Sequence, residues 1–247
     1  MLLGVAQKLH AAAGASDRRY SACPGSFDHS LRRTLRPRNR GSLGSSRIFL
    51  VPRSAPGEAR DRLMETARRR FAADGAIAAT LDEIRRDADV SVGALYHHFP
   101  DKSALAAAVY AELMSEYQAS FVAMLRRQDT AEDGIRGGVA HHLRWVAANR
   151  GEAALLLGDR LDSAELRGAN MEFFAAVRDW WRPHHVYGVL RPMQSGVTAA
   201  LWFGPAQEFS RNWIAGDEPR LPRGVIKTFA DAAWKALRAN DIEEDAG

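Results

Sequence analysis

The side chains best suited to binding another molecule lie together in the run Thr80–Lys102, TLDEIRRDADVSVGALYHHFPDK. Its arginine, tyrosine, histidine and lysine side chains are groups that contact phosphate oxygens. Its small apolar residues, such as Val92 and Ala94, can touch the methyl group of thymine. The residue types in this run therefore favour binding to a nucleic acid.

The first element that positions these residues is a short helix beginning at Leu81. Thr80 and Glu83 form a capping-box pattern, in which the threonine oxygen accepts from the amide of Glu83 and the glutamate reaches back to the amide of Thr80. Leu81, Ile84 and Ala88 recur at the spacing of one buried helix face. The pattern predicts a helix that ends near Ala88.

A turn and a second helix follow. Asp89 tolerates the left-handed conformation of a turn, and Ser91 can cap a helix in which Leu95 and Phe99 face the core. Pro100 then ends that helix. A helix, a turn of about four residues and a second helix have the dimensions of a helix-turn-helix, whose second helix enters the major groove of DNA.

The stretch 60–110 resembles the TetR/AcrR family of one-component transcriptional repressors. Its most specific part is the pattern S-x-G-x-L-Y-x-H-F-x-x-K, which begins at Ser91. The resemblance implies an all-α protein with an N-terminal three-helix helix-turn-helix domain and a C-terminal helical domain for effector binding and dimerisation. It also implies a homodimer that represses from a double-stranded DNA operator and is released by a small apolar or aromatic effector. The matching residues are Arg68, Phe71, Gly75, Thr80, Ile84, Ala88, Val90, Ser91, Gly93, Leu95, Tyr96, His98, Phe99, Lys102 and Leu105.

The second helix and its flanks supply the expected DNA contacts. Val92 and Ala94 are expected to touch thymine methyl groups, and Gly93 allows close approach of the backbone. The polar side chains, and the amides that follow Thr80, are expected to bind phosphates. The predicted DNA-binding residues are Thr80, Arg86, Val92, Gly93, Ala94, Tyr96, His97 and Lys102.

Two residues depart from the family pattern. Arg85 stands where the family has alanine, at a close approach of the two helices, so its side chain must extend to solvent or widen the crossing. Asp89 stands where the family has glycine in the turn. These residues leave an alternative open, a helical dimeric protein-interaction module that has lost specific DNA binding.

The net charge of +4 hides an asymmetry along the 247 residues. Residues 1–60 carry 11 Lys and Arg against 3 Asp and Glu, whereas residues 61–247 carry 23 against 27. The basic character therefore belongs to the N-terminal segment, and phosphate contact must depend on where a few cations lie.

The remaining composition is typical of a soluble globular protein, with 46% hydrophobic and 26% charged residues. A single cysteine, Cys23, excludes an internal disulfide and indicates a reducing compartment, so we expect a cytoplasmic protein. No apolar stretch reaches the roughly 18–20 residues that span a bilayer, so we expect no membrane partner. Because no metal-ligand spacing or catalytic grouping stands out, we expect no metal, no cofactor and no enzymatic activity.

Three segments are predicted. Residues 1–56 are rich in Arg, Ser, Gly and Pro and are expected to form a disordered basic extension. This extension is an arm that grips DNA non-specifically, an inert segment, or sequence upstream of a true start near Val51. Residues 57–106 are the predicted helix-turn-helix domain, and residues 107–247 are the predicted effector-binding and dimerisation domain.

Helical periodicity and the breaks at glycine and proline predict the remaining helices. The first domain begins with a helix over 57–74, in which Leu63, Ala67 and Phe71 face the core and Gly75 ends the helix. No β-alternation is present. After Lys102, six further helices are predicted, over 103–127, 131–149, 151–159, 162–183, 193–215 and 222–239.

The second domain holds all six tryptophans. Aromatic residues at helical spacing build cores, but helix bundles also bind ligands between their helices. We predict that the effector pocket is lined by four large side chains of the middle helices, His142, Trp145, Phe174 and Trp181. The last two helices are predicted either to form a four-helix bundle with a second copy or to cover the domain's own core. The predicted interface residues are Leu201, Phe203, Trp213, Val225, Phe229 and Leu237.

Overall fold

The computed structural model of the chain describes residues 56–158 and 164–239. Every regular element in these two ranges is a helix, and an isolated bridge joins Leu190 to Arg238, so the predicted all-α class is confirmed. None of these helices combines the length and the apolar character needed to cross a membrane. The predicted basic extension and Cys23 lie outside the described residues. The helices are α2 (Pro56–Ala78), α3 (Leu81–Asp87), α4 (Val92–His98), α5 (Lys102–Leu125), α6 (Ala131–Ala148), α7 (Arg150–Leu157), α8 (Ala164–Val186), α9 (Ser195–Ala215) and α10 (Val225–Leu237).

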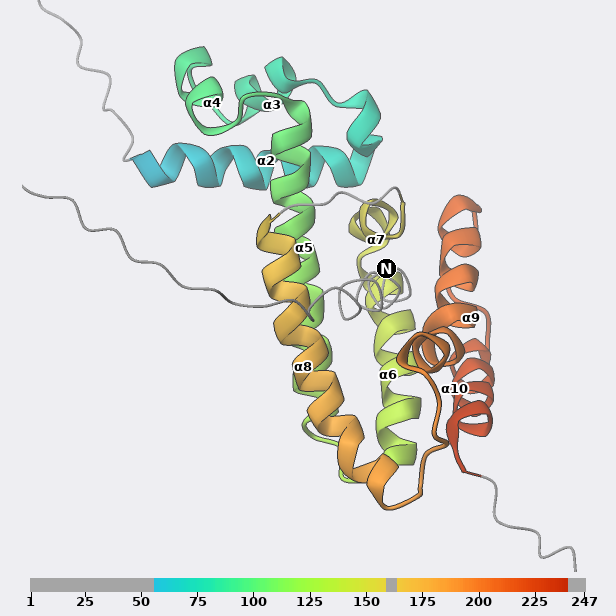
Figure 1. Cartoon of the computed structure of the whole chain (residues 1–247). Coiled ribbons are helices and arrows are strands. Elements are labelled where there is room, and N and C mark those ends of the chain that lie inside the picture. The colour runs from blue at the N-terminus through green and yellow to red at the C-terminus, as the bar shows by residue number, and fades with distance from the viewer. Residues whose placement is uncertain (1–55, 159–163, 240–247) are drawn as a thin grey trace, which may run out of the picture.

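The molecule has a small helical unit at one end of a larger bundle (Figure 1). Helices α2, α3 and α4 form the small unit, and the long helix α5 runs from it into the bundle. Helix α8 lies along α5, while α10 packs against α6 and α9 on the other side of the bundle. Because α5 belongs to both parts, it fixes the orientation of the small unit relative to the bundle.

The helix ends of the structure lie within four residues of those predicted for the described residues, and two ends carry information. Helix α8 continues through Pro183 to Val186, where the sequence predicted a break. A proline in the last turn removes one amide donor without ending the helix, and the amide of Tyr187 still bonds the Pro183 carbonyl oxygen at 2.9 Å. Helix α2 is continued to Ala78 only across a kink at Gly75, whose φ of 81° is left-handed, so the predicted helix end at this glycine is confirmed.

Two apolar clusters form the core. The first joins the small unit to the adjacent part of α5 and to α7, and includes Ile84 and Leu105. The second fills the bundle between α5, α6, α8, α9 and α10, and includes Phe121 and Phe203. Since α5 contributes to both clusters, burial of apolar surface stabilises the small unit and the bundle together.

The small unit and the bundle meet at a close contact between α2 and α7. A Cβ atom at Gly151 would lie 2.3 Å from the carbonyl oxygen of Ala72, so only glycine fits this position. Beside it, Arg68 donates from Nε to Glu152 Oε1 at 2.6 Å and from its two terminal nitrogens to Glu116 at 2.8 and 2.9 Å. The steric contact and the Arg68–Glu152 pair therefore fix α2 on α7, and the bidentate pair with Glu116 fixes α2 on α5.

Candidate nucleic-acid interface

Helix α3 begins at the predicted capping box. The Glu83 amide donates to Thr80 Oγ1 at 3.3 Å, and the Thr80 amide donates to Glu83 Oε2 at 3.0 Å. The Thr80 hydroxyl also donates to Glu83 Oε2 at 2.7 Å. These hydrogen bonds lower the pKa of the Glu83 carboxyl below its usual range. The box fixes the start of the helix on which the turn and the second helix depend.

The turn after α3 accommodates both departures from the family pattern. Asp89 adopts φ 51°, the left-handed conformation that glycine would otherwise provide. Arg85 folds back along α3, donating from Nη1 to the Val90 carbonyl at 3.1 Å and from Nε and Nη2 to Asp82 Oδ1 at 3.2 and 2.9 Å. The hydrogen bond from Arg85 lowers the pKa of Asp82. Arg85 therefore reaches over the turn and bonds it, instead of entering the helix crossing.

Helix α4 presents one face to the core and the other to solvent. Ser91 caps it by accepting from the Ala94 amide at 3.2 Å, and Leu95 on its inner face is buried. On the outer face, Val92 is 55% and Tyr96 is 56% exposed. Gly93 is also exposed, with no heavy atom within 4 Å of a Cβ placed there, and so is His97. Val92 and Gly93 thus lie on the solvent face of a short, capped helix. Ala94, the other predicted base contact, is half-buried and packs against the core, because it lies between the inner and outer faces of the helix.

Three cations in or beside the small unit have local partners. Lys102 Nζ donates to the Ile77 carbonyl oxygen at 2.6 Å, and Arg86 pairs with Asp82. Arg70 Nε donates to Asp87 at 2.7 Å. Because the Arg86 pair is exposed, exchange of its carboxylate for a phosphate costs little, and a lysine ammonium has donors for two acceptors. Contact of these cations with DNA stays a prediction.

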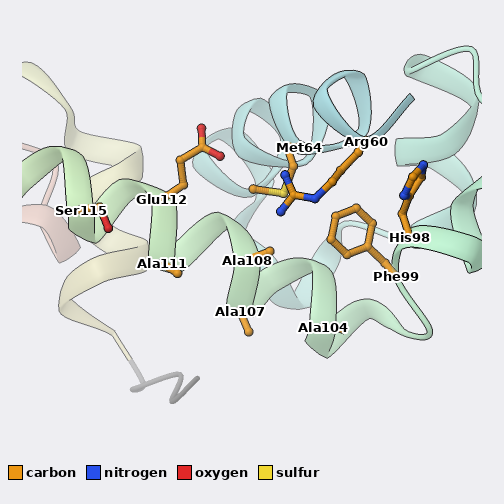
Figure 2. A pocket seen from close by; sticks show the side chains of 10 residues that line it. All are labelled: Arg60, Met64, His98, Phe99, Ala104, Ala107, Ala108, Ala111, Glu112 and Ser115. Carbon is orange, nitrogen blue, oxygen red and sulfur yellow. The ribbon is translucent and has the colours of Figure 1, made fainter. Parts of the chain in front are cut away.

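A groove lies where α2, α4 and α5 meet (Figure 2). Its volume is about 540 Å³, and its floor is mostly alanine side chains of α5. Arg60 reaches across it, with its guanidinium carbon 5.7 Å from the centre of the Phe99 ring. No predicted site residue lines this groove. The lining residues are Arg60, Met64, His98, Phe99, Ala104, Ala107, Ala108, Ala111, Glu112 and Ser115.

The predicted effector residues lie in the aromatic interior of the bundle. His142 is 1% exposed, with Nδ1 3.0 Å from the Tyr117 hydroxyl and Nε2 3.4 Å from Ser210 Oγ. Burial lowers the pKa of His142 to about 3 and raises that of Tyr117, so both groups are neutral. Trp145 is half-buried and packs edge-to-face on Tyr117, with ring centroids 5.0 Å apart.

The two remaining predicted effector residues belong to the same aromatic network but lie farther along it. Phe174 contacts Phe173, with centroids 5.2 Å apart, and Trp181 contacts Trp202 at 5.5 Å. Both are half-buried. None of the four predicted residues lines the groove of Figure 2 or a smaller groove between α9 and α10. The structure therefore places them around the core, and their role in binding an effector stays a prediction.

The predicted interface residues divide into two groups. Phe203, Trp213 and Leu237 are buried in the protomer's own core, which removes these three side chains from its outer surface. Leu201 is 38% exposed and lines the groove between α9 and α10 together with the half-buried Phe229. This groove has a volume of about 220 Å³. Val225 is half-buried at the start of α10.

Sequence reasoning missed two features of the bundle. Gly134 and Gly138 are one turn apart on α6 and give room to Trp180 and Trp202, whose ring atoms would lie 1.9 and 2.9 Å from added Cβ atoms. The Gly-x-x-x-Gly spacing was the available signal. The second feature is Gln207, a fully buried amide on α9. The available signal was a glutamine among the buried, mostly apolar positions of α9.

Comparison with known proteins gives a match over the small unit. Residues 63–109 match the family described as bacterial regulatory proteins, tetR family. A search of curated proteins gave no match.

Solved structures match 74% of the chain in each of three comparisons. A TetR family transcription regulator from Marinobacter aquaeolei VT8 has 16% identity and a TM-score of 0.61, over 74% of this chain and 97% of that chain. The fatty acid degradation regulator FadR from Bacillus halodurans has 19% identity and a TM-score of 0.58, over 74% and 97%. A regulatory protein in the tetR family from Rhodococcus RHA1 has 22% identity and a TM-score of 0.54, over 74% and 98%. At these identities the likeness shows the fold.

Proposed function

We propose that this chain, which carries the DNA-binding domain of the tetR family of bacterial regulatory proteins, is a dimeric repressor that a small apolar or aromatic effector releases from its operator. Its domain and fold are those of a regulator and not of an enzyme. The observation that carries the proposal is the outer face of α4, where Val92, Gly93, Tyr96 and His97 are exposed on a capped helix.

The chemistry of this face indicates how DNA is read. It offers methyl groups, a phenol and an imidazole, and it lacks the arginine, asparagine or glutamine that would bond two positions of a base. Recognition therefore depends on thymine methyl contacts, on phosphate contacts and on the shape of the DNA. Arg85 bonds the turn and Asp89 adopts the left-handed conformation, so neither residue disrupts the helix-turn-helix. This favours DNA binding over the alternative of a protein-interaction module.

A dimer would form through the groove between α9 and α10. Its lining is apolar, with Leu201, Pro205, Phe229, Ala232 and Ala236 at or near the surface. Packing the same two helices of a second copy against it gives a four-helix bundle with two-fold symmetry. Such a dimer places two copies of α4 on one face, which suits a near-palindromic operator with half-sites about one helical turn apart.

Effector release would use the shared helix α5. An effector between the bundle helices shifts α5 or α7, and the junction at Gly151 and Arg68 passes that shift to α2. The two α4 helices then no longer match the spacing of the operator.

A gel shift with the DNA upstream of the chain's own gene tests the proposal. At low and at moderate salt, we expect a retarded complex that contains two protomers, as measured by sedimentation. A retarded complex that forms only at low salt, and equally well with unrelated DNA, would indicate non-specific phosphate binding. A protein that sediments as a monomer at micromolar concentration would contradict the dimer.

A further inference from the structure

Gln207 on α9 is fully buried, with 0% exposure. Neither its Nε2 nor its Oε1 has a hydrogen-bond partner within residues 56–158 and 164–239. Buried carboxamides are almost always hydrogen-bonded, because an unpaired buried donor or acceptor opposes folding. Gln118, also buried, follows this rule and donates to Asn170 Oδ1 at 2.6 Å. Gln207 thus holds an unused donor and an unused acceptor inside the bundle.

The neighbours of Gln207 on α9 show which way it faces. Residues three and four apart share one face of a helix, so Gln207 lies with Phe203 and Ser210. Both of these contact His142 on α6: the ring centroid of Phe203 lies 6.5 Å from that of the imidazole, and Ser210 Oγ lies 3.4 Å from Nε2. The Gln207 face of α9 therefore packs against the middle of the bundle, where His142 lies.

The polar groups on this face already use their protons. Ser210 donates to the Ala206 carbonyl at 2.7 Å, so its oxygen accepts from Nε2–H of the neutral His142. Nδ1 is then unprotonated and accepts from the Tyr117 hydroxyl at 3.0 Å. The chain of bonds Tyr117–His142–Ser210 is complete and leaves no proton for Gln207 Oε1.

Within residues 56–158 and 164–239, no charged side chain hydrogen-bonds to Gln207. Arg211, one turn along α9, pairs with Glu208 at 3.0 Å and donates to the Leu157 carbonyl at 3.2 Å. His142 and Tyr117 are neutral. An ionised group beside Gln207 would be buried without an opposite charge, which is unfavourable. A neutral group that both donates and accepts would instead satisfy the carboxamide.

We infer that Gln207 is the polar anchor of an effector site in the bundle and that it binds a neutral head group, such as a primary amide or a hydroxyl, carried on an apolar body. The inference rests on the proposed effector-responsive function and names the chemistry of the effector. The core around Gln207 is closed here, so side chains at its edge move when the ligand enters. Trp145, half-buried against Tyr117, is placed to report that movement by fluorescence.

Probes with a common octyl tail separate the head groups. Octanamide, N,N-dimethyloctanamide, 1-octanol and octanoate are titrated into the full chain by calorimetry and tryptophan fluorescence, at mildly alkaline pH where octanoate is ionised. We expect octanamide to bind at least about tenfold more tightly than octanoate, and dimethyloctanamide, which lacks donors, to lie between them. In Gln207→Leu the ratio between octanamide and octanoate should fall to about twofold or less.

Matched variants separate anchoring from stability. Gln118→Leu removes a buried glutamine that is already bonded, so it should lower the urea unfolding midpoint and leave the octanamide preference intact. Gln207→Leu should leave the midpoint unchanged or raise it, and Gln207→Met provides a second shape if leucine does not fold.

Three results would overturn the inference: an unchanged head-group ratio in folded Gln207→Leu or Gln207→Met, tightest binding of octanoate, or no binding of any probe up to its solubility limit. The proposed function is tested separately by the gel shift. A chain that fails to bind its upstream DNA contradicts the proposed function, whatever its ratio of octanamide to octanoate affinity.

Discussion

The junction between α2 and α7 makes Gly151→Ala a sharp test of how the small unit is attached. Alanine gains up to about 1 kcal/mol over glycine from helix propensity. Against this, its Cβ would meet the Ala72 carbonyl oxygen at 2.3 Å, and the obstacle is backbone that cannot rotate away. Overpacking of this kind costs about 1–3 kcal/mol, and here the upper end applies because α2 must shift.

The balance is a loss of about 2 kcal/mol in the free energy of unfolding. Urea denaturation followed by circular dichroism would show this as a midpoint lower by about 1 M. The control is Gly168→Ala in α8, where a Cβ meets no heavy atom within 4 Å and where stability should rise by up to about 1 kcal/mol. If Gly151→Ala stabilised the chain as Gly168→Ala does, the two helices would not approach as closely as the structure has them.

Three further predictions concern the ion pairs of Arg68, the phosphate contact expected of Lys102 and the buried His142. In urea denaturation, Arg68→Met should lower the free energy of unfolding by about 2 kcal/mol, because it leaves the carboxylates of Glu152 and Glu116 without their shared cation. The control is Arg69→Met at an exposed position, which should change the free energy of unfolding by less than about 0.5 kcal/mol. Lys102→Ala should weaken binding to all DNA sequences and reduce the slope of log K against log salt by about one, and an unchanged slope would remove the phosphate contact. Because burial lowers the pKa of His142 to about 3, the unfolded chain takes up a proton that the folded chain does not, so stability should fall as pH drops from about 6.5 towards 3. His142→Gln should lack that part of the decline in unfolding free energy between about pH 7 and 5, and an identical decline would show that His142 is not neutral in the fold.

The small unit was predictable because its signals are local. The caps at Thr80 and Ser91 each depend on residues three apart, and both form as the sequence indicates. Asp89 adopts the left-handed turn expected of it. The position of Arg85 was not predictable, because its partner at the Val90 carbonyl exists only once the turn has formed.

The helices of the bundle could be predicted from the sequence, but which molecule each apolar helix face packs against could not. An apolar stripe does not reveal whether it covers its own domain or a second copy, and Phe203, Trp213 and Leu237 cover their own. A proline does not always end a helix: α8 continues through Pro183 in its last turn, and α9 continues through Pro205 near its middle. The unpaired state of Gln207 depends on which groups surround it from α5, α6 and α9, and no local pattern carries that information.

Binding of α4 to DNA is tested most directly by DNase I footprinting on the upstream DNA with wild type and Gly93→Glu. Position 93 has open space around it, so glutamate leaves the fold intact but places a negative charge on the face that would enter the groove. Gly168→Glu, equally open and on α8, carries the same charge as a control. We predict a protected, near-palindromic site with wild type and with Gly168→Glu, and no protection with folded Gly93→Glu. Protection that survives in Gly93→Glu, or its absence in wild type at low salt, would contradict DNA recognition through this helix.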